Sequence, residues 1–235
     1  MKDPAGELMD YLERLTYRYL NLVSLHRELH IINDWRRRPN VSAHESGAYF
    51  FALVGYSFWR TILVDLILLL SENEDKSLLD WLKKAREHAA SLKPSLHDAL
   101  SNIQEPTRLG DYRAIIDGQL SEIQTLEGTI KRMRVHRDKA IAHIDRTYFN
   151  NPGKLCMDYP LICADIDDLL ALVARILKSH YEHVRNVDVD LEVASVSTSD
   201  TLLRCAEAFL KACNDQELIA KGFRPVDYLV DEWKP

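Results

Sequence analysis

Residues 137–143 read RDKAIAH, which places Arg137 and His143 six positions apart. The guanidinium group of arginine is permanently charged and can hold an anionic oxygen through several hydrogen bonds. Histidine is the side chain whose ordinary pKa allows it to exchange protons near neutral pH. The two residue types together indicate chemistry rather than scaffolding.

The same arginine also falls on an apolar stripe. Ile116, Ile123, Ile130, Arg137 and Ile144 recur every seven residues. This spacing predicts one long helix over 111–145, with a charged residue where isoleucine otherwise stands. A guanidinium facing a core is unfavourable without a partner, so we expect one for Arg137.

The geometry of a straight helix separates the two candidate groups. Six residues advance about 9 Å along the axis and turn the side chains about 120° apart. Arg137 and His143 therefore do not share one helix face. If the helix packs against its own copy across a two-fold axis, two such segments can form a composite site.

A run of basic residues precedes and overlaps the pair. Between residues 131 and 139 there are five cations and one acid, a local charge of +4 in a chain of net charge −6. The cationic positions are Lys131, Arg132, Arg134, Arg137 and Lys139, and His136 adds to them when protonated. This concentration favours a partner that carries phosphate. The alternative is a basic helix end that complements the helix dipole.

The composition favours an all-α fold. Apolar residues make up 46% of 235 residues, with eight glycines and eight prolines, and alternating strand patterns are almost absent. The predicted helices span 3–33, 44–71, 77–91, 95–104, 111–145, 163–185 and a segment from Ser199 or Asp200 to Asn214. We expect a helical bundle over 1–185 and, over 186–235, a linker and a C-terminal helical extension that packs on the same domain.

The most apolar stretch covers residues 49–70 and is long enough to span a membrane. Arg60 and Asp65 lie near its middle, where each costs about 2.5–3.5 kcal/mol in a bilayer. We therefore expect a central helix buried by its neighbours and no membrane association. Asp65 is a candidate partner for Arg60 or Arg137.

The four cysteines include no C-x-x-C pair, and the N-terminal residues lack an apolar leader. We expect reduced cysteines in a cytoplasmic protein. His26 and His30 have a spacing that could hold a metal ion, as do His180 and His183. No third ligand is evident nearby, so we interpret both as surface pairs and predict neither a metal site nor a cofactor.

The phrase Arg-Asp-x-x-x-x-His, late in an all-α bundle, resembles the Arg-x4–6-His motif of the HEPN superfamily. With Phe58-Trp59-Arg60 and Asp65 on an upstream apolar helix, it looks most like the abortive-infection (AbiU-like) HEPN proteins. The resemblance covers about residues 40–185. It implies a HEPN-like bundle with additional C-terminal helices.

The resemblance also implies a function. Such proteins are metal-independent ribonucleases of toxin or antiphage type that act as homodimers on RNA, with an antitoxin protein as a further partner. His143 would be the general acid or base, Arg137 would stabilise the phosphorane-like transition state, and Asp138 would orient a catalytic group. Lys131, Arg132, Arg134, His136 and Lys139 would contact RNA.

The chain departs from the family pattern at one position. Some HEPN toxins carry tyrosine two residues after the histidine, as the target of a nucleotidyltransferase antitoxin, whereas this chain has Asp145. That form of neutralisation is not expected here. A function of another class stays open, namely a non-catalytic helical protein that binds a nucleotide, RNA or a partner protein.

Overall fold

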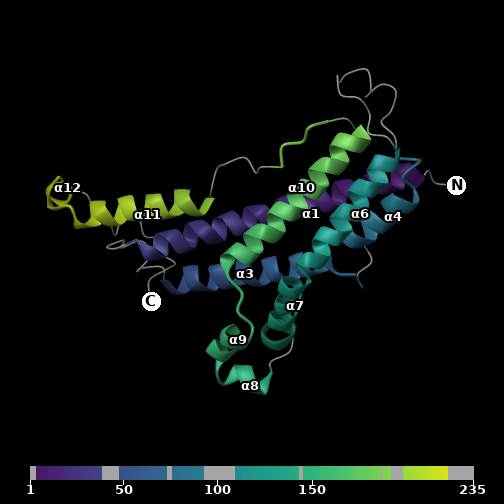
Figure 1. Cartoon of the computed structure of the whole chain (residues 1–235). Helices are drawn as coiled ribbons and strands as arrows, with labels where there is room; N and C mark the ends of the chain where they lie inside the picture. The colour runs from purple at the N-terminus through teal and green to yellow at the C-terminus, as the bar shows by residue number, and fades with distance from the viewer. Residues whose placement is uncertain are drawn as a thin grey trace. The chain divides into compact units, whose positions relative to one another are not determined.

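The computed structural model describes residues 4–38, 48–72, 76–92, 109–142, 145–185, 187–191 and 198–221. Within these ranges the chain forms helices and no strand, as the all-α prediction requires (Figure 1). The helices are α1 (Pro4–Arg37), α3 (Ala48–Leu70), α4 (Leu78–Glu87), α6 (Leu109–Thr125), α7 (Glu127–His136), the π-helix η1 (Arg137–Ala142), α8 (Arg146–Phe149), α9 (Pro152–Asp158), α10 (Cys163–Arg185), α11 (Thr198–Asn214) and α12 (Gln216–Ala220).

The chain divides into two compact units. The first unit comprises Met1–Ser24 and Arg60–Val193, and the second comprises Leu25–Trp59 and Ala194–Pro235. The long helices α1 and α3 each contribute one stretch to both units. The two predicted segments, 1–185 and 186–235, are each continuous in sequence. Each compact unit instead combines two separate stretches of the chain.

The core of the first unit forms where α1, α3, α4, α6 and α10 bury their apolar stripes. Ser77 caps α4 by accepting a hydrogen bond from the backbone N–H of Asp80, which fixes where that helix begins. The indole of Trp81 is fully buried and donates to the backbone oxygen of Leu8 over 2.9 Å. This bond joins α4 to α1 and satisfies the one polar atom of a large core side chain.

The motif region differs from the predicted single helix over 111–145. Ile116, Ile123 and Ile130 are buried, which confirms the apolar seam. The helix is nevertheless interrupted after Thr125, resumes as α7 and changes to the wider π-helical hydrogen bonding at Arg137. Single-turn π segments inside helices often occur at functional sites.

Helix α10 matches its predicted range and carries a buried histidine. His180 is fully buried, so the interpretation of His180 and His183 as a surface pair is wrong for His180. Its Nδ1 lies 2.9 Å from the hydroxyl of Tyr112, and its Nε2 lies 2.8 Å from Oε1 of Gln119. The periodic apolar stripe of α10 includes position 180, and this periodicity is the signal that indicates its burial.

Helix α3 is buried over only part of its length. Its last residues, from Ile62 to Leu70, supply core side chains, but Tyr49, Phe50, Leu53 and Tyr56 are exposed. The expectation of a helix buried by its neighbours therefore holds for the second half and is wrong for the first. By length and composition alone, Ala48–Leu70 could also cross a membrane, but a single helix of this kind is weak evidence for a span.

In the second unit, α11 is anchored to the end of α1. The carboxylate of Glu28 accepts the backbone N–H groups of Thr198 and Ser199, and Trp35 Nε1 donates to Asp200 Oδ1 over 3.0 Å. A carboxylate at this position satisfies free donors at a helix start and interacts favourably with its dipole. The predicted helix over 95–104 lies outside the described residues, and the stretch 146–160, for which no helix was predicted, contains α8 and α9.

Candidate active site

Arg137 is the first residue of η1 and lies at the surface of the first unit. Its side chain is 29% exposed, so the guanidinium is half-buried rather than enclosed in the core. Its Nε donates to Oδ1 of Asp138 over 2.7 Å. Among the described residues, no acceptor contacts the two terminal nitrogens of this guanidinium. Arg137 therefore has its expected acidic partner, and within the described residues its two terminal nitrogens are available as donors.

His136 is the preceding residue and is turned inward. Its ring is 7% exposed, and its Nε2 lies 2.7 Å from the backbone oxygen of Tyr159. A carbonyl oxygen can only accept, so this nitrogen carries the hydrogen. The bond connects the end of α7 to the segment after α9 and holds the helix end beside Arg137.

An ion pair and a backbone hydrogen bond join Lys139 to Asp145, on either side of position 143. Lys139 Nζ donates to Asp145 Oδ2 over 2.6 Å, and the backbone N–H of Asp145 donates to the oxygen of Lys139 over 3.2 Å. The hydrogen bond from Lys139 holds the pKa of Asp145 below its usual value, and the same bond raises the pKa of Lys139. His143 itself lies outside the described residues, but both ends of the stretch 139–145 are tied together.

Asp145 also begins the next helix. Its Oδ1 accepts the backbone N–H of Thr147 over 2.9 Å, which makes it the N-cap of α8. The residue that replaces the tyrosine of some family members thus has a structural role of its own. Sequence reasoning named Asp145 only as a departure, although a residue of this type before a short helix is a recognisable capping signal.

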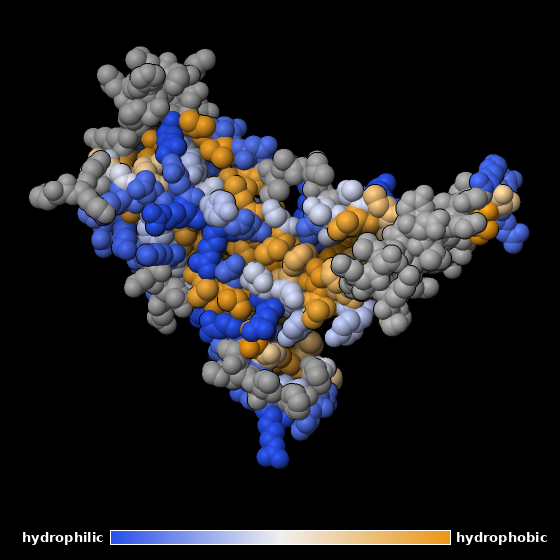
Figure 2. All heavy atoms as spheres, turned by 180° about the vertical axis from the view of Figure 1, so that it is seen from behind, coloured by the Kyte–Doolittle hydropathy of each residue, from blue (hydrophilic) through white to orange (hydrophobic). Residues whose placement is uncertain are grey.

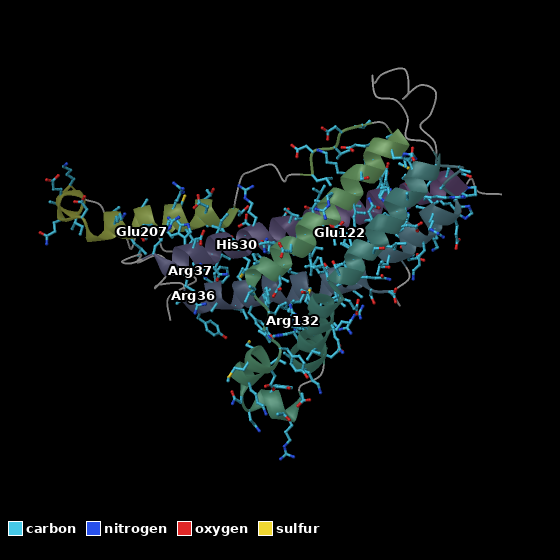
Figure 3. All side chains as sticks on the ribbon, viewed as in Figure 1. His30, Arg36, Arg37, Glu122, Arg132 and Glu207 are labelled. Atoms are coloured by element: carbon cyan, nitrogen blue, oxygen red, sulfur yellow. The ribbon has the colours of Figure 1, made fainter. Side chains whose placement is uncertain are left out.

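The remaining basic residues are mostly paired with acids. Arg132 lies on α7 (Figure 3) and contacts Asp165 over 3.2 Å, and Arg134 contacts Glu127 over 3.0 Å. Lys131 is exposed and has no acidic partner within the described residues. Residues 131–139 alone carry a charge of +4. Three acids from outside this stretch, Glu127, Asp145 and Asp165, pair with its cations, so the net charge of the cluster is about +1.

Asp165 also has a structural role at the start of α10. It lies in the first turn of that helix, and its Oδ2 accepts the backbone N–H of Ile162 over 2.9 Å. The contact between Asp165 and Arg132 was not predicted. The two residues are 33 positions apart, and periodicity does not indicate which charged residues of different helices meet.

The predicted role of Asp65 needs correction. Its carboxylate pairs with Arg18 of α1 over 2.9 Å, and not with Arg60 or Arg137. Both side chains are about one-third exposed, so the pair connects α1 to α3 at the surface of the first unit.

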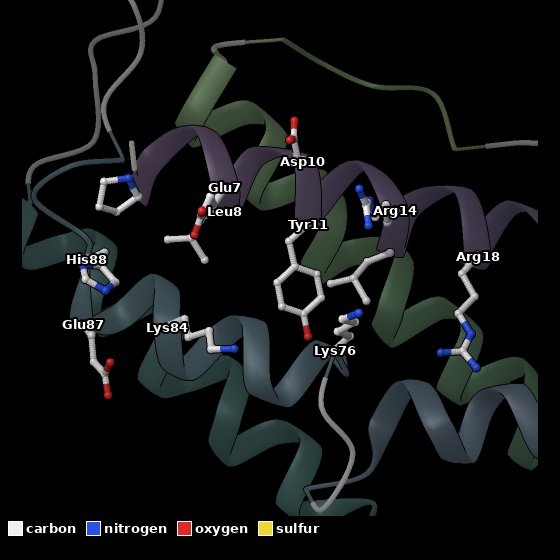
Figure 4. Close-up of a pocket in the computed structure, with 12 residues that line it drawn as sticks. Glu7, Leu8, Asp10, Tyr11, Arg14, Arg18, Lys76, Lys84, Glu87 and His88 are labelled. Atoms are coloured by element: carbon white, nitrogen blue, oxygen red, sulfur yellow. The ribbon is translucent and has the colours of Figure 1, made fainter. Parts of the chain in front are cut away.

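A groove of about 750 Å³ lies between the start of α1 and α4 (Figure 4). Its walls carry charges of both signs, and none of its lining residues belongs to the motif segment. Two of its four cations already have acidic partners, since Arg18 contacts Asp65 and Lys84 contacts Asp80 over 2.7 Å. The groove is therefore separate from the candidate active site and lacks a concentrated charge for an anionic substrate.

In the second unit, His26 and His30 lie next to each other. Their Nε2 atoms are 3.1 Å apart and their rings meet edge to face. Both rings are half-buried, so they are less exposed than the predicted surface pair.

The helical fold and the motif at the end of α7 define a protein of the HEPN class. The family model for AbiU2, a HEPN family, matches residues 4–202. The chain belongs to this AbiU2 family, and the match includes the first helix, which the sequence resemblance over about 40–185 did not cover. Neither the curated proteins nor the solved structures contain a match to the chain.

Proposed function

We propose that this abortive-infection type HEPN protein is a metal-independent endoribonuclease that cleaves RNA at a composite site in a cytoplasmic homodimer. The half-buried guanidinium of Arg137 is the observation that supports this most. Asp138 accepts from its Nε, and its terminal nitrogens, which contact no acceptor in the described part of the chain, can donate to a phosphate. Two parallel donors in a rigid fork match the geometry of phosphate oxygens.

The proposed reaction is an internal transfer at one phosphodiester. The ribose 2′-oxygen attacks the adjacent phosphorus and the bond from phosphorus to the 5′-oxygen breaks, which yields a 2′,3′-cyclic phosphate and a 5′-hydroxyl. His143 takes the proton from the 2′-hydroxyl, or gives a proton to the leaving oxygen. Arg137 stabilises the extra negative charge on the phosphorane-like transition state. The ribose supplies the nucleophile, so DNA is not a substrate.

The surrounding residues have separate roles in this proposal. Asp138 orients the guanidinium, and His136 holds the helix end through the oxygen of Tyr159. Lys131 is exposed and would contact an RNA phosphate directly. Arg132, Arg134 and Lys139 would contact RNA by exchanging an acidic partner for a phosphate, which limits the affinity that they add. An antitoxin protein would act by covering this surface.

The test uses an RNA oligonucleotide and the same oligonucleotide with one 2′-deoxyribose at the cleaved position. Cleavage of the first, with a 2′,3′-cyclic phosphate end, and no cleavage of the second is the expected result. Arg137→Lys keeps the charge but loses the fork, so we expect a loss of about 100-fold in kcat. Equal cleavage of both oligonucleotides would contradict the 2′-hydroxyl mechanism.

The pairing of four cations with acids favours a second candidate function. A segment of low net charge attracts RNA weakly, which suits a non-catalytic protein that binds a nucleotide, RNA or a partner protein. In that case RNA would bind without being cleaved, and Arg137→Ala would change affinity alone. The same oligonucleotide measurements distinguish the two candidates.

A further inference from the structure

The first half of α3 presents an uncharged, largely aromatic surface. Residues 48–59 read AYFFALVGYSFW and contain no acidic or basic residue. Four large side chains of this stretch are exposed, namely Tyr49 at 84%, Phe50 at 60%, Leu53 at 53% and Tyr56 at 54%. Figure 2 shows hydrophobic side chains, in orange, reaching the molecular surface. We call the surface of these four residues the aromatic face.

The four side chains form one continuous strip. Tyr49, Leu53 and Tyr56 are spaced by four and three residues, so they lie on the same side of the helix, with Phe50 beside them. Within the second unit, another side of the helix is covered by α1. A methyl group added at Gly55 would lie only 3.6 Å from Cδ1 of Leu29. One side of the helix therefore packs within the unit while the aromatic face remains exposed.

The size of the aromatic face suits a protein contact. Aromatic side chains bury about 150–250 Å² each, so these four residues offer about 500 Å² per copy at their observed exposure. Patches of this size on a monomer are often functional. Two copies in contact would bury about 1,000 Å², close to the lower limit of stable interfaces.

We propose that the aromatic face packs against the same face of a second copy of this chain. A two-fold axis brings this surface against its own copy, so an apolar strip meets an apolar strip. A surface without charges then buries no charge that lacks a partner. An interfacial membrane helix instead carries lysine or arginine along its own polar face, and residues 48–59 have none.

The charged residues nearby lie at the two ends of the face rather than on it, and exposed Arg60, four residues after Tyr56, lies at one of them. Leu29 of α1 lies opposite Gly55 of α3, and the two helices run antiparallel (Figure 1). Arg36 is seven residues beyond Leu29 and Ala48 is seven residues before Gly55, so both lie at the same end of the pair. Figure 3 labels Arg36 and Arg37 at this end of α1. Arg36 and Arg37 are exposed and would belong to the polar rim of the contact.

This inference rests on the homodimer of the proposed function, but its test needs no nuclease activity. The full chain is examined by light scattering coupled to size exclusion, from about 1 to 100 μM. We expect a dimer for the wild type and a monomer for Leu53→Glu and for Tyr49→Glu. Tyr17→Glu is the matched control, because Tyr17 is 70% exposed on α1 in the first unit and outside the aromatic face, and it should remain dimeric. Circular dichroism verifies that each variant is folded.

A disulfide cross-linking experiment tests the same contact and does not depend on the stability of the dimer. Near a two-fold axis, Leu53→Cys should form a disulfide with its own copy under mild oxidation, beyond the background of the exposed Cys156, Cys163 and Cys205 seen in the wild type. A monomeric wild type at 100 μM, or a Leu53→Glu variant that stays dimeric, would overturn the proposal. So would binding of the wild type to phosphatidylserine vesicles that Leu53→Glu abolishes, because a lipid surface would then occupy the face. A dimer without RNA cleavage would overturn the proposed nuclease and leave this contact standing.

Discussion

The guanidinium of Arg137 donates from Nε to Oδ1 of Asp138, the next residue in the chain, over 2.7 Å. The contact has two opposing effects on a phosphate ligand. It fixes the orientation of the guanidinium, and it also places a negative charge beside the atoms that would hold the phosphate. Asp138 is thus expected to favour catalysis while weakening the binding of RNA.

Replacement of Asp138 separates these two effects. For Asp138→Ala we expect RNA to bind at least as tightly, because one negative charge is gone, and kcat to fall about tenfold, which corresponds to about 1.4 kcal/mol of transition-state stabilisation. Asp138→Asn keeps an acceptor oxygen and should lose less activity than Asp138→Ala. Single-turnover cleavage and filter binding measure the two quantities. Glu127→Ala is the control, since it frees Arg134 from its partner but leaves Arg137 untouched. A kcat for Asp138→Ala equal to the wild-type value would refute the orienting role.

The contact between Lys139 and Asp145 gives a prediction about the segment that carries His143. Both ends of 139–145 are joined by this ion pair and by a backbone hydrogen bond. Reversal of either charge alone, by Lys139→Asp or Asp145→Lys, should lower kcat about tenfold because the histidine is then held less firmly. The double reversal should recover part of the loss.

The stability of the fold serves as the control for this cycle. The ion pair is exposed enough to add little to stability, so Lys139→Asp should melt near the wild-type temperature. The two variants with lysine at position 145 also lose the N-cap of α8, so both should melt at one common, lower temperature. If the double variant is as inactive as the worse single variant, the pair does not position His143.

Some of these features follow from the sequence and others do not. The seven-residue spacing of Ile116, Ile123 and Ile130 predicted the buried seam, because helical periodicity determines which residues share a face. The interruption after Thr125 and the π-helical turn at Arg137 were not predicted, since no proline marks either position and a single glycine such as Gly128 is tolerated inside a helix.

Two further features do not follow from the sequence, namely which apolar residues are exposed and which charged residues form ion pairs. The first half of α3 has the composition of a core helix, and hydrophobicity alone does not distinguish a core from an intermolecular contact. The candidate motif was recognisable from two residues, Arg137 and His143. One of the acids that pair with its cations, Asp165, comes from another helix, so the surface charge could not be counted before the fold was known.

The buried His180 predicts a specific dependence of stability on pH. Burial, and to a smaller extent the nearby His183, lowers the pKa of His180 from 6.5 to about 3. Below pH 6.5 the unfolded chain binds a proton at this position and the folded chain does not, so the free energy of unfolding falls as the pH falls towards 3. Between pH 7 and pH 5 the loss from this residue is about 2 kcal/mol.

Urea unfolding of the wild type and of His180→Gln at the two pH values measures this effect. The variant should be less stable at pH 7, because the hydrogen bonds with Tyr112 and Gln119 are disturbed. When the pH falls from 7 to 5, its free energy of unfolding should decrease by about 2 kcal/mol less than that of the wild type. Equal losses for the two proteins would show that His180 does not remain neutral in the folded state.

The most direct test of the proposed function is RNA cleavage in the presence of EDTA, by the wild type and by His143→Ala. We predict that the wild type cleaves at the same rate with and without EDTA, because Arg137 and His143 perform the reaction without a metal ion. His143→Ala should have no measurable cleavage and an unchanged circular dichroism spectrum. Cleavage that persists in His143→Ala, or that stops in the wild type when EDTA is added, would contradict the mechanism.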